Sequence, residues 1–192
     1  MKKLTLTDIL VTVTIAFGFG VIYKLWGPLY YSVKPLGIHL DQLIYGMWFI
    51  AAIVAFAIVK KAGVAFLAEL AASSGELIMG SEFGLEVLLY GALQGVGAEL
   101  AFALFKYKSE SVMVMALAGL FSGVASLLLD FFKGYIGELE LWNLLLFIGL
   151  RLMGSIVLAG ILGYAIARGI ESTGVTASLH GGTKEDYDAL ER

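Results

Sequence analysis

The chain has 192 residues, of which 59% are hydrophobic and 15% charged, and its mean hydropathy is +0.89. This balance excludes an ordinary soluble domain, because about a quarter of the residues in such domains are charged. The small net charge of −3 and the scattered basic residues argue against a nucleic-acid partner, and the absence of cysteine excludes disulfides and thiolate metal sites.

Six apolar stretches along the chain are long enough, or nearly so, to cross the roughly 30 Å hydrocarbon core of a bilayer as helices. They run from Thr7 to Leu25, Leu43 to Val59, Ala62 to Met79, Phe83 to Phe105, Ser111 to Phe132 and Leu141 to Ala167. No small-residue cleavage site follows the first stretch, so we expect it to stay as a helix rather than be removed as a signal peptide. The sequence therefore predicts an all-α integral membrane protein, with residues 1–170 forming a bundle of six transmembrane helices.

The joint between the second and third stretches decides whether the helix count is even. Only Lys60 and Lys61 separate them, and Gly63 follows. One continuous helix would overshoot the membrane, so the glycine favours a tight turn and an antiparallel hairpin. With that turn, basic residues concentrate at alternate helix ends: Lys2, Lys3, Lys60, Lys61, Lys106, Lys108 and Arg168. Because such residues favour the cytoplasmic side, we expect a multi-pass protein of the cell membrane with both termini in the cytoplasm.

Two long segments fall outside the predicted helices. The connection from Trp26 to Gln42 is expected to be a loop on the outer face, where a loop of this length is able to act as a lid. Residues 171–192 form a polar tail, which we expect to be solvated on the cytoplasmic side.

The outer helix ends are rich in aromatic residues, which permits two interpretations. They are Tyr23, Trp26, Tyr30, Tyr31, Tyr45, Trp48, Tyr135 and Trp142. Most residues of this kind form an aromatic belt at the membrane interface. Some can instead provide a surface on which the rings of a ligand stack.

Polar side chains recur at helical spacing within four of the predicted helices. An ionisable group at bilayer depth costs at least about 2.5 kcal/mol, so each one needs a partner or a ligand. The four stripes are Glu69, Ser73 and Glu76; Glu86, Tyr90 and Gln94; Ser122, Ser126 and Asp130; and Asn143, Phe147 and Arg151. Residues spaced by three or four share a helix face, so we expect all four stripes to point inward, in the outer half of the bundle.

The charges in these stripes leave two interpretations open. Glu69 and Arg151 lie at similar depth, and they either form a buried ion pair or leave Glu69 available to a ligand. Glu76, Glu86 and Asp130 lie nearer the outer surface and have no matching intramembrane cation in the sequence. Three such acids predict a cationic or hydrogen-bond-donating ligand, unless Glu76 and Glu86 simply face water at the interface.

The motifs of common enzyme classes are missing. Both histidines, His39 and His180, lie outside the predicted helices, and the sequence contains neither an HExxH zinc motif nor a Walker A loop. We therefore expect no catalytic activity, no metal and no cofactor. The inner halves of the helices are nearly all apolar, which argues against a continuous channel and favours a binding cup.

Small residues form a further pattern in the first predicted helix, where Thr12, Ala16 and Gly20 recur every four positions. Such spacing lets two helices approach closely. Packing within the chain is the ordinary explanation, and docking on another membrane protein is the alternative.

Two stretches of the sequence resemble a known family. They are LTLTDILVTVTIAFGFGVIYKLWGPLY and FLAELAASSGELIMGSEFGLEVLLYGALQGVGAEL. Together with the chain length and the six helices, they resemble the S components of energy-coupling-factor (ECF) vitamin transporters, most closely the YkoE type for thiamine and hydroxymethylpyrimidine. The resemblance implies a substrate-capture subunit without ATPase activity, which works with a transmembrane coupling subunit and cytoplasmic ATPase subunits. It also implies that Ala16 and Gly20 contact the coupling subunit.

Thiamine suits the predicted polar cup, although the sequence does not choose between thiamine and its hydroxymethylpyrimidine moiety. The aminopyrimidine has hydrogen-bond donors and acceptors, the thiazolium is cationic, and both rings can stack. For the pyrimidine edge we predict Glu86, Gln94 and Asn143. For the thiazolium charge we predict Glu69, Glu76 or Asp130, and for stacking Tyr45, Trp48, Tyr90, Trp142 or Trp26.

Two other functions stay open at this point. One is a proton-coupled transporter of a small organic cation, which the intramembrane acids favour and the lack of an evident inverted repeat disfavours. The other is a membrane assembly subunit that binds no ligand and whose charges pair internally.

Overall fold

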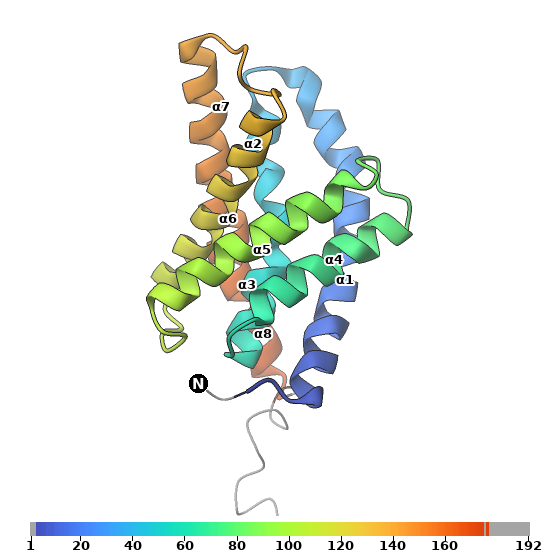
Figure 1. Ribbon diagram of the computed structural model, residues 1–192, viewed down its shortest axis with the longest axis vertical. Coiled ribbons are helices and arrows are strands. Elements are labelled where there is room, and N and C mark those ends of the chain that lie inside the picture. The colour runs from blue at the N-terminus through green and yellow to red at the C-terminus, as the bar shows by residue number, and fades with distance from the viewer. Residues whose placement is uncertain (1–2, 175, 177–192) are drawn as a thin grey trace, which may run out of the picture.

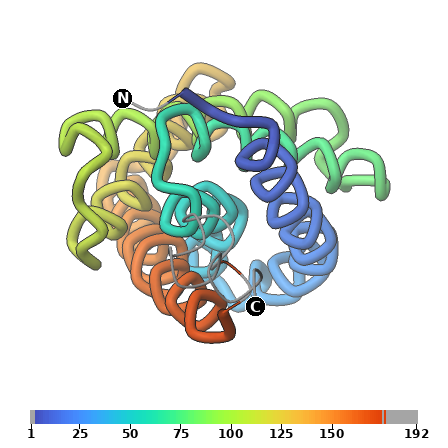
Figure 2. Tube along the Cα trace, turned by 90° about the horizontal axis from the view of Figure 1, so that it is seen from below, coloured from blue at the N-terminus to red at the C-terminus, as the bar shows by residue number. Residues whose placement is uncertain are grey.

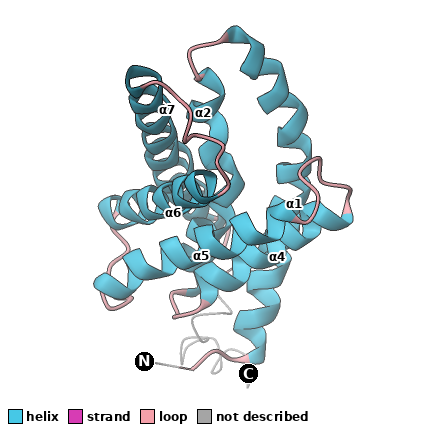
Figure 3. Cartoon of the chain, turned by 45° about the horizontal axis from the view of Figure 1, so that its top comes forward, coloured by secondary structure: helices cyan, strands magenta, loops and turns pink. Residues whose placement is uncertain are grey.

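The computed structural model describes residues 3–174 and 176, and every regular element in them is helical (Figure 1, Figure 3). The α-helices are α1 (Leu6–Val33), α2 (Leu40–Ile44), α3 (Ile50–Val59), α4 (Val64–Ile78), α5 (Glu86–Leu104), α6 (Val112–Phe132), α7 (Leu141–Gly154) and α8 (Gly163–Ser172). Two short 3-10 helices, η1 (Lys34–Leu36) and η2 (Tyr45–Phe49), flank α2, and a π-helical stretch, η3 (Ser155–Leu162), joins α7 to α8. The all-α prediction is confirmed.

Five helical segments in the described residues are long and apolar enough to cross a membrane. They are Leu6–Leu36, Leu40–Val59, Glu86–Leu104, Val112–Phe132 and Leu141–Ser172. These segments correspond to all of the predicted stretches except the third, which is α4. With 15 residues, α4 spans only about 22 Å at 1.5 Å per residue, less than the thickness of a bilayer core.

The first helix is longer than the sequence indicated. Thr5 and Asp8 form a capping box at its start, in which the Thr5 backbone N–H donates to the Asp8 carboxylate at 2.6 Å. The helix then continues through Pro28 to Val33 instead of ending at Leu25. The predicted outer loop from Trp26 to Gln42 is therefore wrong, because most of it is helical. A membrane helix tolerates an internal proline where neighbouring groups satisfy the freed backbone.

The turn predicted between the second and third stretches is present. Lys60 ends α3 in the left-handed conformation with φ 57°, and Gly63 precedes α4 with φ 86°. Lys60 and Gly63 thus reverse the chain, and the alternative of one continuous helix is wrong. Glycine suits this turn because a positive φ costs it little.

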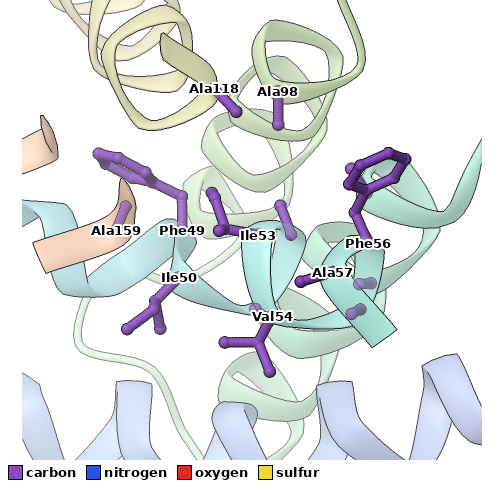
Figure 4. Close-up of a cluster of buried hydrophobic side chains, with 14 of the residues drawn as sticks. Phe49, Ile50, Ile53, Val54, Phe56, Ala57, Ala98, Ala118 and Ala159 are labelled. Atoms are coloured by element: carbon purple, nitrogen blue, oxygen red, sulfur yellow. The ribbon is translucent and has the colours of Figure 1, made fainter. Parts of the chain in front are cut away.

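Helix α3 is the centre of the molecule. All ten of its residues are at most 8% exposed, and the other helices surround it (Figure 2). Its side chains form the hydrophobic core with small residues of neighbouring helices, among them Ala98, Ala118 and Ala159 (Figure 4). The Phe56 ring stacks on Phe102 with centroids 3.6 Å apart. A helix that is apolar on every side can be buried in this way.

Helices α4 and α5 cross the long axis of the bundle obliquely (Figure 1). Glycines permit their close contacts: a Cβ at Gly20 of α1 would lie 2.8 Å from Ala72 O of α4, and one at Gly97 of α5 would lie 2.6 Å from Phe121 O of α6. Since real Cβ atoms do not approach this closely, these helix pairs depend on glycine.

The start of α1 and the end of α8 lie at the same end of the molecule (Figure 1). Ion pairs connect helices there: Lys61 with Asp8 at 2.5 Å, and Lys60 with both Glu110 at 2.8 Å and Glu171 at 3.2 Å. The predicted polar tail, residues 171–192, lies mostly outside the described residues, as does His180, and α8 extends as far as Ser172.

Candidate functional site

A cavity of about 690 Å³ lies at the end of the molecule opposite the ion-paired helix ends. Its wall comes from the C-terminal parts of α1, α4 and α6, from α2 and η2, from the first half of α5 and from α7. Residues of the connections before α2, α5 and α7 complete it. The polar stripes of α4, α5, α6 and α7 converge on it. Its volume is in the range of pockets that enclose a small organic molecule.

Seven of the residues predicted to bind substrate line this cavity. They are Tyr45, Trp48, Glu76, Glu86, Tyr90, Gln94 and Asp130. Four others do not line it: Trp26, Glu69, Trp142 and Asn143. Two of the outer aromatic residues, Tyr23 and Tyr30, also line the cavity, as do Asp41, Gln42, Phe83 and Arg151, which were not predicted to bind substrate.

Arg151 is the centre of a buried polar network, with a side chain 2% exposed. Its Nη2 lies 3.0 Å from Asp130 Oδ2, its Nε donates to Gln42 Oε1 at 2.6 Å, and its Nη1 donates to Ser126 Oγ at 2.9 Å. The guanidinium carbon also lies 3.4 Å from the centroid of the Tyr45 ring. Three hydrogen-bonding partners and an aromatic face fix this cation in position.

Asp130 and Gln42 extend the network around the cavity. The Tyr90 hydroxyl donates to Asp130 Oδ1, and the Gln42 amide donates to the Tyr30 hydroxyl at 2.9 Å and to Asp41 Oδ2 at 2.6 Å. The network therefore connects α1, α2, α5, α6 and α7. Bonds shared among so many helices make the shape of this wall resistant to small rearrangements.

The pairing of charges differs from the expectation drawn from the sequence. Arg151 pairs with Asp130 rather than with Glu69, so the ion pair considered for Glu69 is wrong. The expectation that Asp130 has no intramembrane counter-charge is also wrong, because Arg151 provides it. Glu86 pairs with Lys133, just past the end of α6, and its side chain is 40% exposed, which agrees with the alternative that Glu86 faces water. Helix depth alone did not reveal which helices are neighbours.

Glu69 lies beneath the cavity and caps a helix. Helix α3 begins inside the bundle, so its first N–H groups need acceptors from elsewhere. The N–H of Ala52 donates to Glu69 Oε2 at 3.3 Å, and the N–H of Ala51 donates to the Tyr23 hydroxyl at 3.0 Å. Tyr23 in turn donates to Glu69 Oε2 at 2.9 Å. Glu69 therefore serves the junction of α1, α3 and α4, and a carboxylate suits the N-terminal end of a helix.

Three buried polar atoms on the cavity wall form no hydrogen bond of ordinary geometry with the described residues, although the Trp48 side chain lies beside the Glu76 carboxylate. They are Trp48 Nε1, Glu76 Oε2 and Gln94 Nε2. Their side chains are 6%, 2% and 2% exposed, respectively. The other Glu76 oxygen accepts from Ser81 Oγ at 2.9 Å. Since a buried polar group without a partner costs roughly 1–3 kcal/mol, the wall offers two N–H donors and one acceptor to a molecule inside.

Aromatic rings form the apolar part of the wall. The Trp48 ring lies edge-to-face with Tyr30 at 5.0 Å and with Phe83 at 5.4 Å, and Phe83 stacks on Tyr31 at 5.9 Å. Tyr30 and Tyr31 thus line a cavity rather than only a membrane belt. Tyr30 is buried, whereas Tyr31 is 42% exposed. The inward position of Tyr30 follows from the extension of α1 past Pro28, and its spacing of seven from Tyr23, which places both on one helix face, is a signal in the sequence.

The predicted residues outside the cavity have other partners. Trp26 Nε1 donates to Ile44 O at 2.9 Å, and the exposed Trp142 donates to Glu140 Oε2 at 2.8 Å. Asn143 Oδ1 lies 2.6 Å from His39 Nε2. That hydrogen bond fixes the linker 37–39, which has positive φ at each residue and lines the cavity. Asn143 thus contributes to the site through His39.

Ala16 and Gly20, the residues predicted to contact the coupling subunit, face the interior of this chain. Ala16 is 0% exposed, and Gly20 packs against the backbone of α4. The small-residue stripe therefore serves packing between α1 and α4. The outward face of α1 carries large apolar residues, among them Leu10 and Phe17, which are 58% and 60% exposed.

Comparison with known proteins places this architecture in a family. The model of the family described as "ABC-type cobalt transport system, permease component" matches residues 7–125. The "Putative HMP/thiamine permease protein YkoE" of Bacillus subtilis (strain 168) is 32% identical over 186 residues, which cover 91% of this chain and 88% of that protein. A solved structure described as an S-component of ECF transporter has a TM-score of 0.87 and 31% identity, covering 92% of this chain and 90% of its own. The chain belongs to the S components of ECF transporters, and within them to the YkoE type.

Proposed function

We propose that this protein captures thiamine, or its hydroxymethylpyrimidine moiety, in the cavity and presents it to an ECF module. The observation that carries the proposal is the set of unpartnered groups on the wall: Trp48 Nε1, Glu76 Oε2 and Gln94 Nε2. An aminopyrimidine has the complementary groups, because its exocyclic amine donates and its ring nitrogens accept. The name of the YkoE relative points to the same substrates.

The orientation in the membrane is part of the proposal. The ends of α1, α3 and α8 that carry Lys60, Lys61 and Arg168 would face the cytoplasm, by the preference of basic residues for that side. The cavity, at the opposite end, would then open to the outside. In this orientation the described termini are cytoplasmic, and α4 counts as a sixth, short and oblique spanning segment of a cell-membrane protein.

The proposal gives this chain no part in ATP hydrolysis. As an S component, the protein would rely on a transmembrane coupling subunit and on cytoplasmic ATPase subunits for energy. Its own task is selective binding.

Calorimetric titration of the detergent-purified protein with thiamine and with hydroxymethylpyrimidine tests the proposal. We expect saturable binding of at least one of the two, and Gln94→Ala or Trp48→Phe should weaken it about tenfold or more, because each removes an N–H donor buried on the wall. Trp142→Phe is the matched control for Trp48→Phe, since Trp142 is 64% exposed and lies outside the cavity. Absence of binding of both compounds to the wild-type protein would refute the substrate assignment.

A further inference from the structure

The charges on the cavity wall are not balanced. Four carboxylates line the cavity, those of Asp41, Glu76, Glu86 and Asp130. Asp130 pairs with Arg151, and Glu86 pairs with Lys133. Within the described part of the chain, Asp41 and Glu76 form no ion pair, although they are only 4% and 2% exposed.

A basic residue that also lines the cavity does not correct this imbalance. Lys34 Nζ lies 5.9 Å from the centroid of the Tyr31 ring and makes no ion pair with Asp41 or Glu76 within the described part. A buried carboxylate without a counter-charge is costly, because its attraction to water is lost and nothing replaces it. A cationic group of the substrate would replace it.

The surroundings of the two acids assign them different tasks. Glu76 shares the cavity with the unpartnered donors of Trp48 and Gln94, so this half offers directional hydrogen bonds. Asp41 lies instead beside Gln42, whose amide donates to it at 2.6 Å and to the Tyr30 hydroxyl at 2.9 Å. The Tyr30 ring packs against Tyr45 at 6.2 Å and against Trp48 at 5.0 Å, so Trp48 lies between the two acids and its neighbours Tyr30 and Tyr45 are the rings on the Asp41 side.

A fixed carboxylate beside aromatic rings is suited to a cation that has no N–H to donate. Gln42 holds Asp41, and Arg151 Nε holds Gln42 at 2.6 Å, so the position of the carboxylate is set by the buried network. An alkylated ring nitrogen cannot form a conventional hydrogen bond. It is recognised through charge and through the faces of aromatic rings, both of which are strongest away from water.

We infer that Asp41 is the counter-ion for a permanently charged ring of the substrate and is the residue that makes the cavity prefer thiamine to the neutral hydroxymethylpyrimidine. This inference rests on the proposed function. In this arrangement the pyrimidine binds beside Glu76 and the thiazolium binds beside Asp41. Asp41 thereby determines specificity, while the Glu76 half supplies the affinity common to both compounds.

Titration of Asp41→Asn with both compounds tests the inference. Asparagine keeps the shape of the side chain and an oxygen that accepts from Gln42, so only the charge is lost. We expect thiamine to bind the variant about tenfold or more weakly than the wild type, and hydroxymethylpyrimidine to bind within about twofold of the wild type. Glu138→Gln is the control for net charge, because Glu138 is exposed and does not line the cavity.

A second measurement compares two ligands on the wild-type protein, so its main result does not depend on the folding of a variant. A thiamine analogue in which a neutral thiophene ring replaces the thiazolium should bind the wild-type protein about tenfold or more weakly than thiamine does. Asp41→Asn should bind thiamine and this analogue with equal affinity.

The possible outcomes separate the two proposals. If the wild-type protein binds neither thiamine nor hydroxymethylpyrimidine, the proposed function itself fails, and the role of Asp41 fails with it. If the wild type binds thiamine and Asp41→Asn binds it equally well, or loses both compounds to the same extent, Asp41 is not the specificity determinant while the proposed function stands. A wild type that prefers the neutral analogue to thiamine would likewise overturn the inference.

Discussion

The buried ion pair between Arg151 and Asp130 offers a direct test of the network that shapes the cavity. Asp130→Asn keeps the shape of the side chain but removes the charge that balances Arg151. The two side chains are 2% and 7% exposed, so water cannot replace the lost carboxylate. The variant should therefore be clearly less stable than the wild type.

The burial of the pair sets the expected size of the effect. Removal of one partner from a buried pair costs about 3–5 kcal/mol, and the lower end applies here because asparagine can still accept from Arg151. For a chain of this length, each kcal/mol lowers the melting temperature by roughly 2–4 °C, so a loss of about 6–12 °C is expected. The double variant Asp130→Asn with Arg151→Met should recover more than half of that loss, because no unbalanced charge remains.

Thermal unfolding in one detergent, without ligand, measures these changes. Glu86→Gln is the matched control, since it breaks the ion pair with Lys133 where the Glu86 side chain is 40% exposed, and it should leave the melting temperature unchanged. A melting temperature of Asp130→Asn within about 2 °C of the wild type would show that the pair does not sustain this wall. A double variant no more stable than Asp130→Asn would show that the loss came from shape rather than charge.

Two further predictions concern a helix contact and a helix cap, and thermal unfolding measures both. Gly97→Ala should lower the free energy of unfolding by about 1–3 kcal/mol, because the new Cβ would lie 2.6 Å from Phe121 O. The control Gly18→Ala, with nothing within 4 Å, should be neutral or slightly stabilising. Equal melting temperatures of the two variants would contradict the close α5–α6 contact. Tyr23→Phe should lower the free energy of unfolding by about 1–3 kcal/mol, because the Ala51 N–H loses its acceptor and Glu69 loses a donor. The control Tyr164→Phe removes only a partly exposed hydroxyl and should change the melting temperature little. If both variants have the same melting temperature, the cap on α3 does not contribute to stability.

Much of the fold was predictable from the sequence, because a chain in lipid must satisfy its backbone hydrogen bonds within each segment. Helix positions then follow from local composition, and the stretches from Ser111 to Phe132 and from Leu141 onward begin within one residue of α6 and α7. The turn at Lys60 and Gly63 could also be predicted, because lysine and glycine are unfavourable in the middle of an apolar helix. The length of α1 could not be predicted, since the effect of Pro28 depends on the groups packed around it.

The candidate site was likewise predictable only in part. Spacing by three or four fixes a helix face, so the inward direction of Glu76, Gln94 and Asp130 could be predicted from residue positions alone. The tertiary structure decided which faces meet: Arg151 pairs with Asp130 rather than Glu69, and Asp41 enters the cavity from a segment expected to be part of a loop. The sequence determines each helix and its polar face because both depend on residues at most a few positions apart. The partners of a buried charge depend on how helices distant in sequence cross, and only the packed bundle determines that crossing.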